Sequence, residues 1–136
     1  LNKMNVKINL HCYYYKRSPS QELEKLCSKV YYYQRSMNYI NMLSKSPFMI
    51  QSRSSSELLR NLNQDNFPIL FEGLHSCFEI SNPKLKERLK IIRMHNIEYQ
   101  YYGGLSKFTN NPLKKMYYLT ESKKLYIYEK FTFCVL

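Results

Sequence analysis

The segment that most constrains the fold of this chain is KIIRMHNIEYQYY, residues 90–102. It begins as a short apolar run of the kind that forms a buried parallel strand. Asn96 is a favoured residue for capping the start of a helix, and Glu98 would lie in the first helical turn, where an acidic side chain suits the helix dipole. The segment therefore predicts a strand, a tight turn and a helix. Ligands bind at the carboxyl ends of strands in open α/β sheets, so this turn is the first candidate site.

Other segments repeat this alternation. Strands are expected at residues 6–15, 30–33, 67–71 and 90–94. Helices are expected after Pro19, after the capping box at residues 54–57, and from Asn111-Pro112 to about Phe131. The pattern predicts one α/β domain, a Rossmann-like parallel sheet of roughly four or five strands flanked by helices. Gly103-Gly104 is expected to end the helix that follows residue 96 early.

Both ends of the sequence suggest an incomplete domain. Residues 1–5 run directly into the first expected strand, as the last turn of a helix would, and residues 133–136 are apolar and follow a helix directly. A doubly wound sheet that begins in this way lacks its first strand and the Gly-rich loop after it, where phosphates bind. The three glycines of the chain do not form such a loop.

The chain is strongly basic, with a formal net charge of +11 over 136 residues. This charge favours anionic partners, namely nucleic acid, acidic lipid headgroups or phosphorylated small molecules, although a solvated basic surface is the simpler reading. The 14 tyrosines could stack on bases, or could pack in the core where they fall in strands. A basic nucleic-acid-binding module without catalytic activity is therefore one hypothesis. The sequence carries no RNA-recognition, zinc-knuckle or helix-turn-helix signature, which makes nucleic acid the less favoured partner.

Cysteine usage and motif content exclude several other classes. Cys12, Cys27, Cys77 and Cys134 form no C-x-x-C pair and have no histidine at zinc-site spacing, so no metal site is expected. Scattered thiols in a chain without a signal peptide favour a cytoplasmic location. No apolar run approaches the roughly 20 residues of a membrane-spanning helix. Nucleophile-elbow, HExxH and phosphate-loop motifs are also absent from the sequence.

Two expected strand ends carry side chains suited to binding or acid–base chemistry. Arg93 and His95 are two residues apart and would point to the same side of their strand, where they could reach one ligand. Glu72, Gly73 and His75 end the preceding strand, and the glycine would let the backbone approach a ligand closely. A Glu–His pair could act as a general base, or could be a structural hydrogen bond between two loops. A structural role for Arg93 and His95 stays open in the same way.

Four segments together resemble the amino-terminal domain of bacterial family 4 glycosyltransferases of the GT-B fold, and specifically those of the Bacteroidetes type. The segments are VKINLHCYYY, PILFEGLHS, NPKLKERLKIIRMHNIEYQYYGGL and LKKMYYLTESKKLYIYEKF. The family pattern R-x-H-N-[IV]-E followed by Tyr-Tyr matches residues 93–98 with Tyr101 and Tyr102, and E-G-[IL]-H matches residues 72–75. Each motif is short, so the specificity lies in their combination over nearly the whole chain.

The resemblance implies a two-domain enzyme whose amino-terminal domain holds the acceptor and whose carboxy-terminal domain holds the nucleotide-sugar donor. Transfer in this family is independent of metal ions and retains the anomeric configuration. Residues 1–136 would form part of the amino-terminal domain, would lack the donor domain, and would be inactive alone. The resemblance places the catalytic role on His95 and acceptor-side binding on Glu72, Gly73, His75, Arg93, Asn96 and Glu98.

The same resemblance names the partners to expect. The acceptor would be a glycan or a lipid-linked saccharide, and the nucleotide-sugar donor would bind the missing domain, leaving this chain without a cofactor of its own. Because such acceptors are often phosphorylated lipids, a basic face could dock on the anionic inner surface of a membrane. A non-catalytic remnant without a partner is a third reading that the sequence leaves open.

Overall fold

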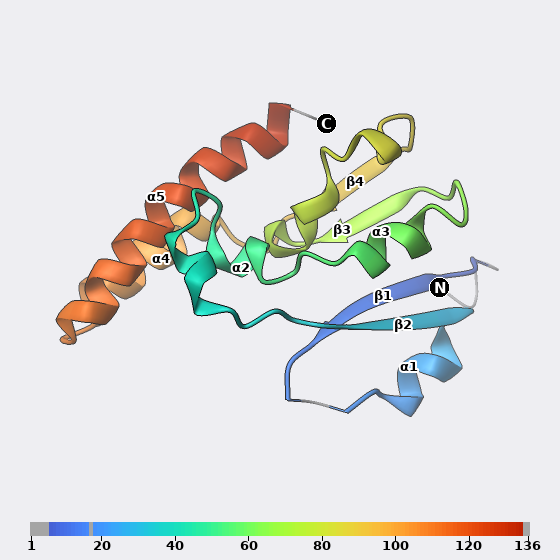
Figure 1. The fold of residues 1–136 in the computed structure, drawn as a ribbon, viewed down its shortest axis with the longest axis horizontal. Helices are drawn as coiled ribbons and strands as arrows, with labels where there is room; N and C mark the ends of the chain where they lie inside the picture. The colour runs from blue at the N-terminus through green and yellow to red at the C-terminus, as the bar shows by residue number, and fades with distance from the viewer. Residues whose placement is uncertain (1–5, 17, 135–136) are drawn as a thin grey trace.

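The computed structural model describes residues 6–16 and 18–134 (Figure 1). Its strands are β1 (Asn9–Tyr14), β2 (Lys29–Gln34), β3 (Ile69–Glu72) and β4 (Lys90–Arg93). Its α-helices are α1 (Gln21–Leu26), α2 (Phe48–Gln51), α3 (Ser56–Leu62), α4 (Glu98–Phe108) and α5 (Pro112–Cys134). Three 3₁₀ segments connect them: η2 (Tyr39–Leu43), η3 (Leu74–Glu79) and η4 (Pro83–Leu85).

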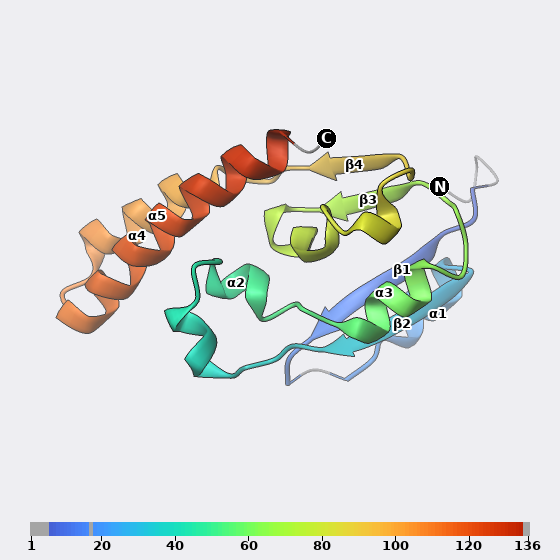
Figure 2. The same cartoon turned by 45° about the horizontal axis from the view of Figure 1, so that its top comes forward.

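The strands pair as two separate two-stranded parallel sheets, β1 with β2 and β3 with β4. Figures 1 and 2 agree that all four strands run in the same general direction, with β1 and β3 as the inner strands and β2 and β4 outside them. The fold is thus the incomplete Rossmann-like α/β fold that the sequence predicts. It differs in one respect: its strands form two small sheets instead of one, because no strand of the described residues joins β1 to β3.

The alternation of side chains along the strands determines which helices cover them. A buried cluster of Tyr33, Leu58, Leu62 and Leu85 joins β2, α3 and η4, and the partly buried Tyr13, Tyr31, Leu59 and Ile69 pack against it. Since Tyr13 belongs to β1 and Ile69 to β3, one face of both sheets shares this core. The intervening Tyr32 points to the other face, where its hydroxyl donates to the backbone oxygen of Ser20 just before α1. The strand tyrosines therefore mostly pack within the domain, as the strand pattern predicts.

Of the three predicted helix caps, the one at Asn111 forms, and the one predicted by the capping box at residues 54–57 forms one residue later than that box would place it, at Ser55. The hydroxyl of Ser55 accepts a hydrogen bond from the backbone N–H of Leu58 (3.1 Å), and the side chain of Asn111 accepts one from the N–H of Lys114 (3.1 Å). The predicted cap at Asn96 is wrong, because α4 begins at Glu98 and follows Ile97, which provides no side-chain cap. The hydrogen-bond acceptor at the start of α4 is instead the carboxylate of Glu129, which belongs to α5.

The prediction that Gly103-Gly104 ends its helix early is also wrong, since α4 continues to Phe108. A Cβ at Gly103 would lie 3.5 Å from the hydroxyl oxygen of Ser122 on α5. That hydroxyl donates to the backbone oxygen of Tyr99 (2.7 Å). Gly103 therefore lies where α4 packs on α5, and this extensive packing outweighs the low helix propensity of glycine.

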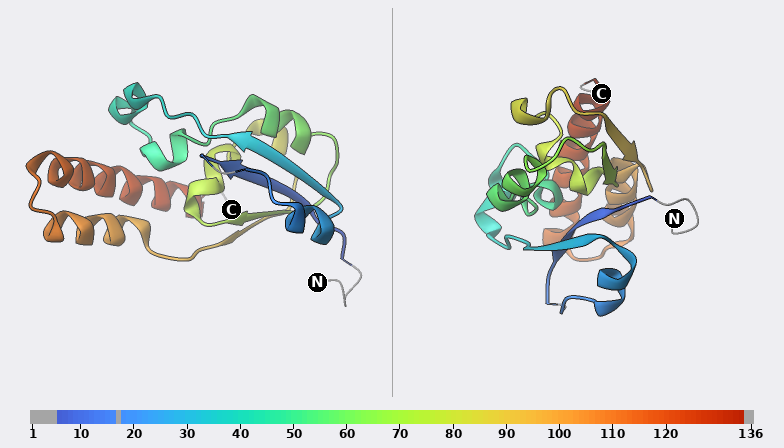
Figure 3. Two further views of the ribbon diagram at one scale, coloured as in Figure 1. Left: turned by 90° about the horizontal axis from the view of Figure 1, so that it is seen from below. Right: turned by 90° about the vertical axis from the view of Figure 1, so that its right-hand side faces the viewer.

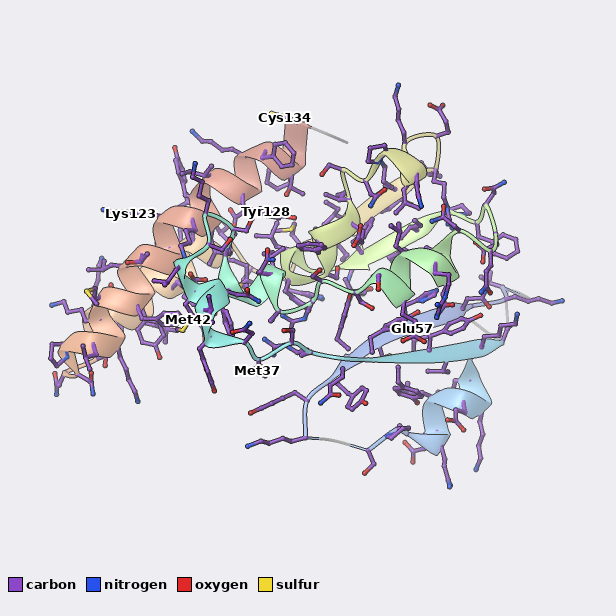
Figure 4. The ribbon with its side chains drawn as sticks, in the orientation of Figure 1. Met37, Met42, Glu57, Lys123, Tyr128 and Cys134 are labelled. Atoms are coloured by element: carbon purple, nitrogen blue, oxygen red, sulfur yellow. The ribbon has the colours of Figure 1, made fainter. Side chains whose placement is uncertain are left out.

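The α4–α5 pair projects from one end of the domain (Figure 3). It is held to the strand region by a buried cluster of Ile50, Leu74 and Leu125. Tyr128, labelled in Figure 4, contributes a hydroxyl that donates to the backbone oxygen of Cys77 (2.8 Å). No helix within residues 6–16 and 18–134 has the length and apolar character needed to cross a bilayer.

Candidate functional site

The carboxyl ends of β3 and β4 bring together three of the side chains that the sequence singles out. Glu72 and Arg93 are partners in the strand register, and one carboxylate oxygen (Oε2) of Glu72 lies 3.0 Å from Nε of Arg93. The same oxygen lies 3.1 Å from Nε2 of His95. The side chains of Glu72 and His95 are 48% and 42% exposed, so this trio is open to solvent and accessible to a ligand.

Gly73 brings a second imidazole to the same place. Its φ of +78° and ψ of 157° describe a backbone conformation that essentially only glycine adopts. A Cβ at this position would lie 2.7 Å from Cε1 of His75 and 3.2 Å from Cδ2 of His95. Gly73 is therefore required both for the turn from β3 into η3 and for the close approach of the two histidine rings.

His75 is partly buried beneath the open trio, and its electrostatic environment is positive. Burial lowers the pKa of its imidazole to about 4, and the positive charges of Arg53, His95 and Arg35 act in the same direction. His75 is therefore neutral at physiological pH, with one ring nitrogen as a donor and the other as an acceptor.

Arg35 and Arg53 are two charged residues near this site that the sequence analysis does not identify. Arg35 follows β2 directly and bonds the hydroxyl of Ser52 through Nη2 (2.8 Å) and Nε (3.3 Å). Arg53 donates to the backbone oxygen of Met49 (2.5 Å), and burial, followed by repulsion from Arg35, lowers its pKa to about 10, which leaves it protonated at neutral pH. Arg35 could have been found by the strand-end argument that identifies Arg93. Arg53 follows a segment without regular periodicity and has no such signal.

Asn96 and Glu98 occupy different environments from the trio. Glu98 is buried at the start of α4, where burial and then the charge of Glu129 raise the pKa of its carboxyl group, while the charges of His95 and Arg53 oppose that rise. Glu98 is thus withdrawn from solvent, yet close enough to His95 for the charge of that imidazole to affect its pKa. Asn96 is exposed and lines a groove of about 590 Å³ between this turn and α5, together with His95, Tyr126 and Lys130.

The contact between Glu72 and His95 determines which imidazole nitrogen of His95 carries a proton. An ionised carboxylate only accepts hydrogen bonds, so Nε2 of His95 carries the proton that it shares with Glu72. In the neutral imidazole, Nδ1 is then an acceptor that can receive a proton from a hydroxyl group. Arg93 adds a positive charge within the same trio. Within the part of the chain that the structure describes, no three His, Cys, Asp or Glu residues are grouped so as to hold a metal ion.

Comparisons with known proteins give one informative similarity. No family model matches the chain, and no solved structure shows a significant match. The chain is 33% identical over 105 residues to a Klebsiella pneumoniae protein described as "Uncharacterized 44.6 kDa protein in cps region". The match covers 74% of this chain and 27% of that protein, so the chain spans about a quarter of the length of this relative. That description names a gene region and no activity.

Proposed function

We propose that this chain is the acceptor-side part of a glycosyltransferase that works in polysaccharide biosynthesis. The observation that carries the proposal is the trio of Glu72, Arg93 and His95 at the carboxyl ends of two adjacent parallel strands, which is where open α/β sheets bind ligands. The similarity to a protein of a cps (capsular polysaccharide) region supports the pathway. The resemblance of residues 72–75 and 93–98 to family 4 glycosyltransferase motifs supports the reaction class.

The roles of the residues follow from the hydrogen bonds. Glu72 holds the ring of His95 with Nε2 protonated, so that Nδ1 faces a ligand as an acceptor for a sugar hydroxyl. Arg93 binds a negatively charged group of the acceptor, such as a phosphate. In the transfer, the acceptor oxygen forms the new glycosidic bond and loses its proton, while the bond between the donor sugar and the nucleoside diphosphate breaks. The donor binds a separate domain of the longer polypeptide.

We also propose that the acceptor is lipid-linked and that the outer face of α5 docks on an anionic membrane. Met116 and Ile127 are 63% and 69% exposed on this face, beside Lys115 and Lys123. Lys123 points away from the domain in Figure 4. Such a mixture of basic and apolar side chains is typical of helices that lie at a lipid surface.

Loss of the gene product is the direct test of the proposed function. In cells that lack it, lipid-linked saccharides analysed by mass spectrometry should accumulate an intermediate that is one sugar short. The intact wild-type polypeptide should restore the full saccharide, and so should the control variant Arg60→Ala, which changes an exposed residue of α3. The variant His95→Ala should not. An unchanged saccharide profile, or full rescue by His95→Ala, would contradict the proposal.

The alternative of a nucleic-acid-binding module gains no support from the arrangement of the tyrosines. Tyr13, Tyr31 and Tyr33 pack toward α3, and Tyr32 bonds to Ser20 on the opposite face, so the strand tyrosines do not form one stacking platform. The alternative makes its own prediction, which is retention of single-stranded oligonucleotides with a steep dependence on salt. Such retention at physiological salt, together with an unchanged saccharide profile, would favour it.

A further inference from the structure

Two arginines near the candidate site are held by one chain of hydrogen bonds. Arg35 donates to the hydroxyl of Ser52 through Nη2 (2.8 Å), and that hydroxyl donates to the backbone oxygen of Met49 (3.2 Å). The same backbone oxygen accepts a hydrogen bond from Nη1 of Arg53 (2.5 Å). Arg35 follows β2, whereas Arg53 lies just after α2, so these bonds bring together two guanidinium groups from separate segments.

No carboxylate neutralises this pair within residues 6–16 and 18–134. Neither Arg35 nor Arg53 belongs to an ion pair there, and Glu98 acts on the pKa of Arg53 without forming one. The hydrogen bonds leave Nη1 of Arg35, and Nε and Nη2 of Arg53, without a partner in that part of the chain. Withdrawing a guanidinium from water without a counter-ion costs free energy, and the binding of an anion offsets that cost.

The phenolic hydroxyl of Tyr13 is a further polar group that lacks a partner. Its oxygen is buried and makes no hydrogen bond among the described residues. Burial raises the pKa of Tyr13 and the charge of Glu79 adds to the rise, while the charge of Arg53 opposes it. Tyr13 in turn raises the pKa of Arg53, so these two side chains lie within electrostatic reach of each other. Buried hydroxyls are nearly always hydrogen-bonded, so an unpaired one near an unneutralised guanidinium is typical of a binding site for a polar ligand.

His75 connects the arginines to the proposed catalytic residue. Cε1 of its ring and Cδ2 of His95 lie 2.7 and 3.2 Å from the position that a Cβ on Gly73 would take. After burial, the charges of Arg53, His95 and Arg35, in that order, lower the pKa of His75. The two arginines and the two histidines therefore form one basic cluster at the carboxyl ends of the strands, where open α/β sheets bind ligands.

We propose that Arg35, Arg53, His75 and the hydroxyl of Tyr13 form a binding site for the diphosphate group of a substrate. Guanidinium groups match phosphate oxygens in geometry and in charge, and the two arginines together offset two negative charges. The neutral imidazole and the hydroxyl can each donate one hydrogen bond to a phosphate oxygen. Four donor side chains from four segments of the chain thus converge on one place, which an isolated basic side chain on the surface does not achieve.

The identity of the substrate rests on the proposed function. Both substrates of the proposed transfer can carry a diphosphate, namely the lipid-linked acceptor and the nucleotide-sugar donor. On the acceptor, Arg35 and Arg53 would hold the head group with its sugar beside His95. On the donor, they would stabilise the negative charge that develops on the leaving diphosphate. Binding of the diphosphate group itself depends on neither assignment.

NMR of the His75 imidazole tests whether an anion binds beside it. In the intact polypeptide without ligand, the pKa of His75 should be about 4. Saturation with inorganic pyrophosphate should raise that pKa by at least about one unit, because a bound anion favours the protonated imidazole. His11, whose charged neighbours are Asp65 and Arg88, is the internal control and should not respond. An unchanged pKa of His75 at saturating pyrophosphate overturns the proposal.

Substitutions at the arginines and at Tyr13 measure what each group contributes. Arg35→Met and Arg53→Met should each weaken pyrophosphate binding, measured by isothermal titration calorimetry, by about tenfold or more. Arg60→Met is the matched control, because Arg60 is 74% exposed on α3 and pairs with Glu57. Tyr13→Phe removes only the unpaired hydroxyl, so it should weaken binding severalfold without lowering the Tm, and it keeps the test valid if Arg53→Met fails to fold. Unchanged affinity in Arg35→Met and in Tyr13→Phe overturns the proposal.

Competition experiments identify the molecule that carries the diphosphate. Stronger displacement of pyrophosphate by farnesyl diphosphate than by uridine diphosphate assigns the site to the lipid-linked acceptor, and the reverse order assigns it to the donor. Equally strong displacement by sulfate at the same concentration overturns the proposal, because it indicates general attraction of anions to a basic protein. These measurements involve no sugar transfer, so they succeed or fail separately from the saccharide profile that tests the proposed function.

Discussion

Glu129, near the end of α5, caps the start of α4: its carboxylate accepts a hydrogen bond from the backbone N–H of Tyr99, 3.3 Å away. The first N–H groups of a helix have no partner within the helix, and Asn96 does not supply one here. The turn that carries His95 is thus held in place by a residue more than thirty positions later in the chain. The position of the candidate site depends on the α4–α5 pair for this reason.

Glu129→Ala should lower the free energy of unfolding by about 1–2 kcal/mol, because it removes the acceptor from a buried helix end. Glu129→Gln keeps an acceptor oxygen and should retain most of the stability. Urea denaturation measures both. Glu57→Ala is the control: Glu57 lies in the first turn of α3, is 58% exposed, and should change stability by at most about 0.5 kcal/mol. Equal losses of stability in Glu129→Ala and Glu57→Ala would exclude the capping role of Glu129.

Gly73→Ala should be among the most damaging single-methyl changes in the chain. The new Cβ would lie 2.7 Å from the ring of His75 in a backbone conformation with φ of +78°, so we expect a loss of about 3 kcal/mol or more. Gly104→Ala makes the matched comparison, because a Cβ there meets nothing within 4 Å. It should stabilise α4 by about 0.5–1 kcal/mol. The Tm of the two variants, measured by thermal denaturation, should therefore shift in opposite directions from that of the wild type. A Gly73→Ala variant with an unchanged Tm would contradict the described turn.

His75 should make stability depend on pH. Its pKa is lowered from 6.5 to about 4 in the folded protein, mainly by burial, so between these values the unfolded chain binds more protons than the folded one. Stability should consequently rise as pH increases from 4 to 6.5, and the contribution of His75 should be lost as pH falls through this window. The whole shift would correspond to about 3 kcal/mol, but His75 is only partly buried, so solvent screening should reduce its contribution to on the order of 1–2 kcal/mol.

His75→Gln should flatten this part of the pH profile, because glutamine does not titrate. The raised pKa values of Glu98 and Glu129 have the opposite sign, so the comparison is made between wild type and variant. Their stabilising contribution is present at low pH and is lost as pH rises through their folded pKa values, in both proteins alike. Urea denaturation at a series of pH values measures the difference, and an identical slope in the two proteins would refute the assignment.

The basic and the apolar side chains on the outer face of α5 should contribute separately to membrane binding. Lys115→Glu with Lys123→Glu should weaken binding to vesicles with anionic lipid by at least about tenfold, since each lysine near such a surface contributes roughly 1 kcal/mol. Met116→Ser with Ile127→Ser should weaken the same binding through lost apolar contact. Lys84→Glu with Lys86→Glu, on the separate segment around η4, is the control. Co-sedimentation measures all three, and equal losses for both lysine pairs would indicate nonspecific attraction to a basic protein.

Much of this structure follows from local sequence signals, and the exceptions have physical reasons. The strands and the start of α5 at Pro112 depend on residues close in sequence, and the predictions for them are confirmed. The cap predicted from residues 54–57 is also present, at Ser55 and so one residue later than the capping box places it. The predictions at Asn96 and Gly103 rest on propensity alone, and both are wrong because α5 supplies a cap at one place and a packing surface for α4 at the other. Contacts between segments that are distant in sequence are not visible in local patterns.

The candidate site also has one part that local sequence predicts and another part that it does not. The ends of β3 and β4 follow a strand-end rule, so the sequence by itself predicts that Glu72, Arg93 and His95 lie near each other. The approach of Arg53 to His75 depends on the path of an irregular segment, and no periodic pattern predicts that path.

His95 is the proposed catalytic residue of the intact polypeptide. His95→Ala should lower turnover by about 10²–10⁴-fold, the range typical of a positioned proton-transferring side chain. Its side chain is 42% exposed, so thermal stability should change little. Glu72→Gln keeps the size of the side chain and removes the charge that orients the imidazole, and it should lower turnover by a smaller factor with stability unchanged. Arg60→Ala, at an exposed position on α3, should leave both quantities unchanged. If His95→Ala instead lowers the Tm strongly while turnover per folded molecule is preserved, then the bond between His95 and Glu72 is a structural link between two strand ends, and the catalytic assignment is wrong.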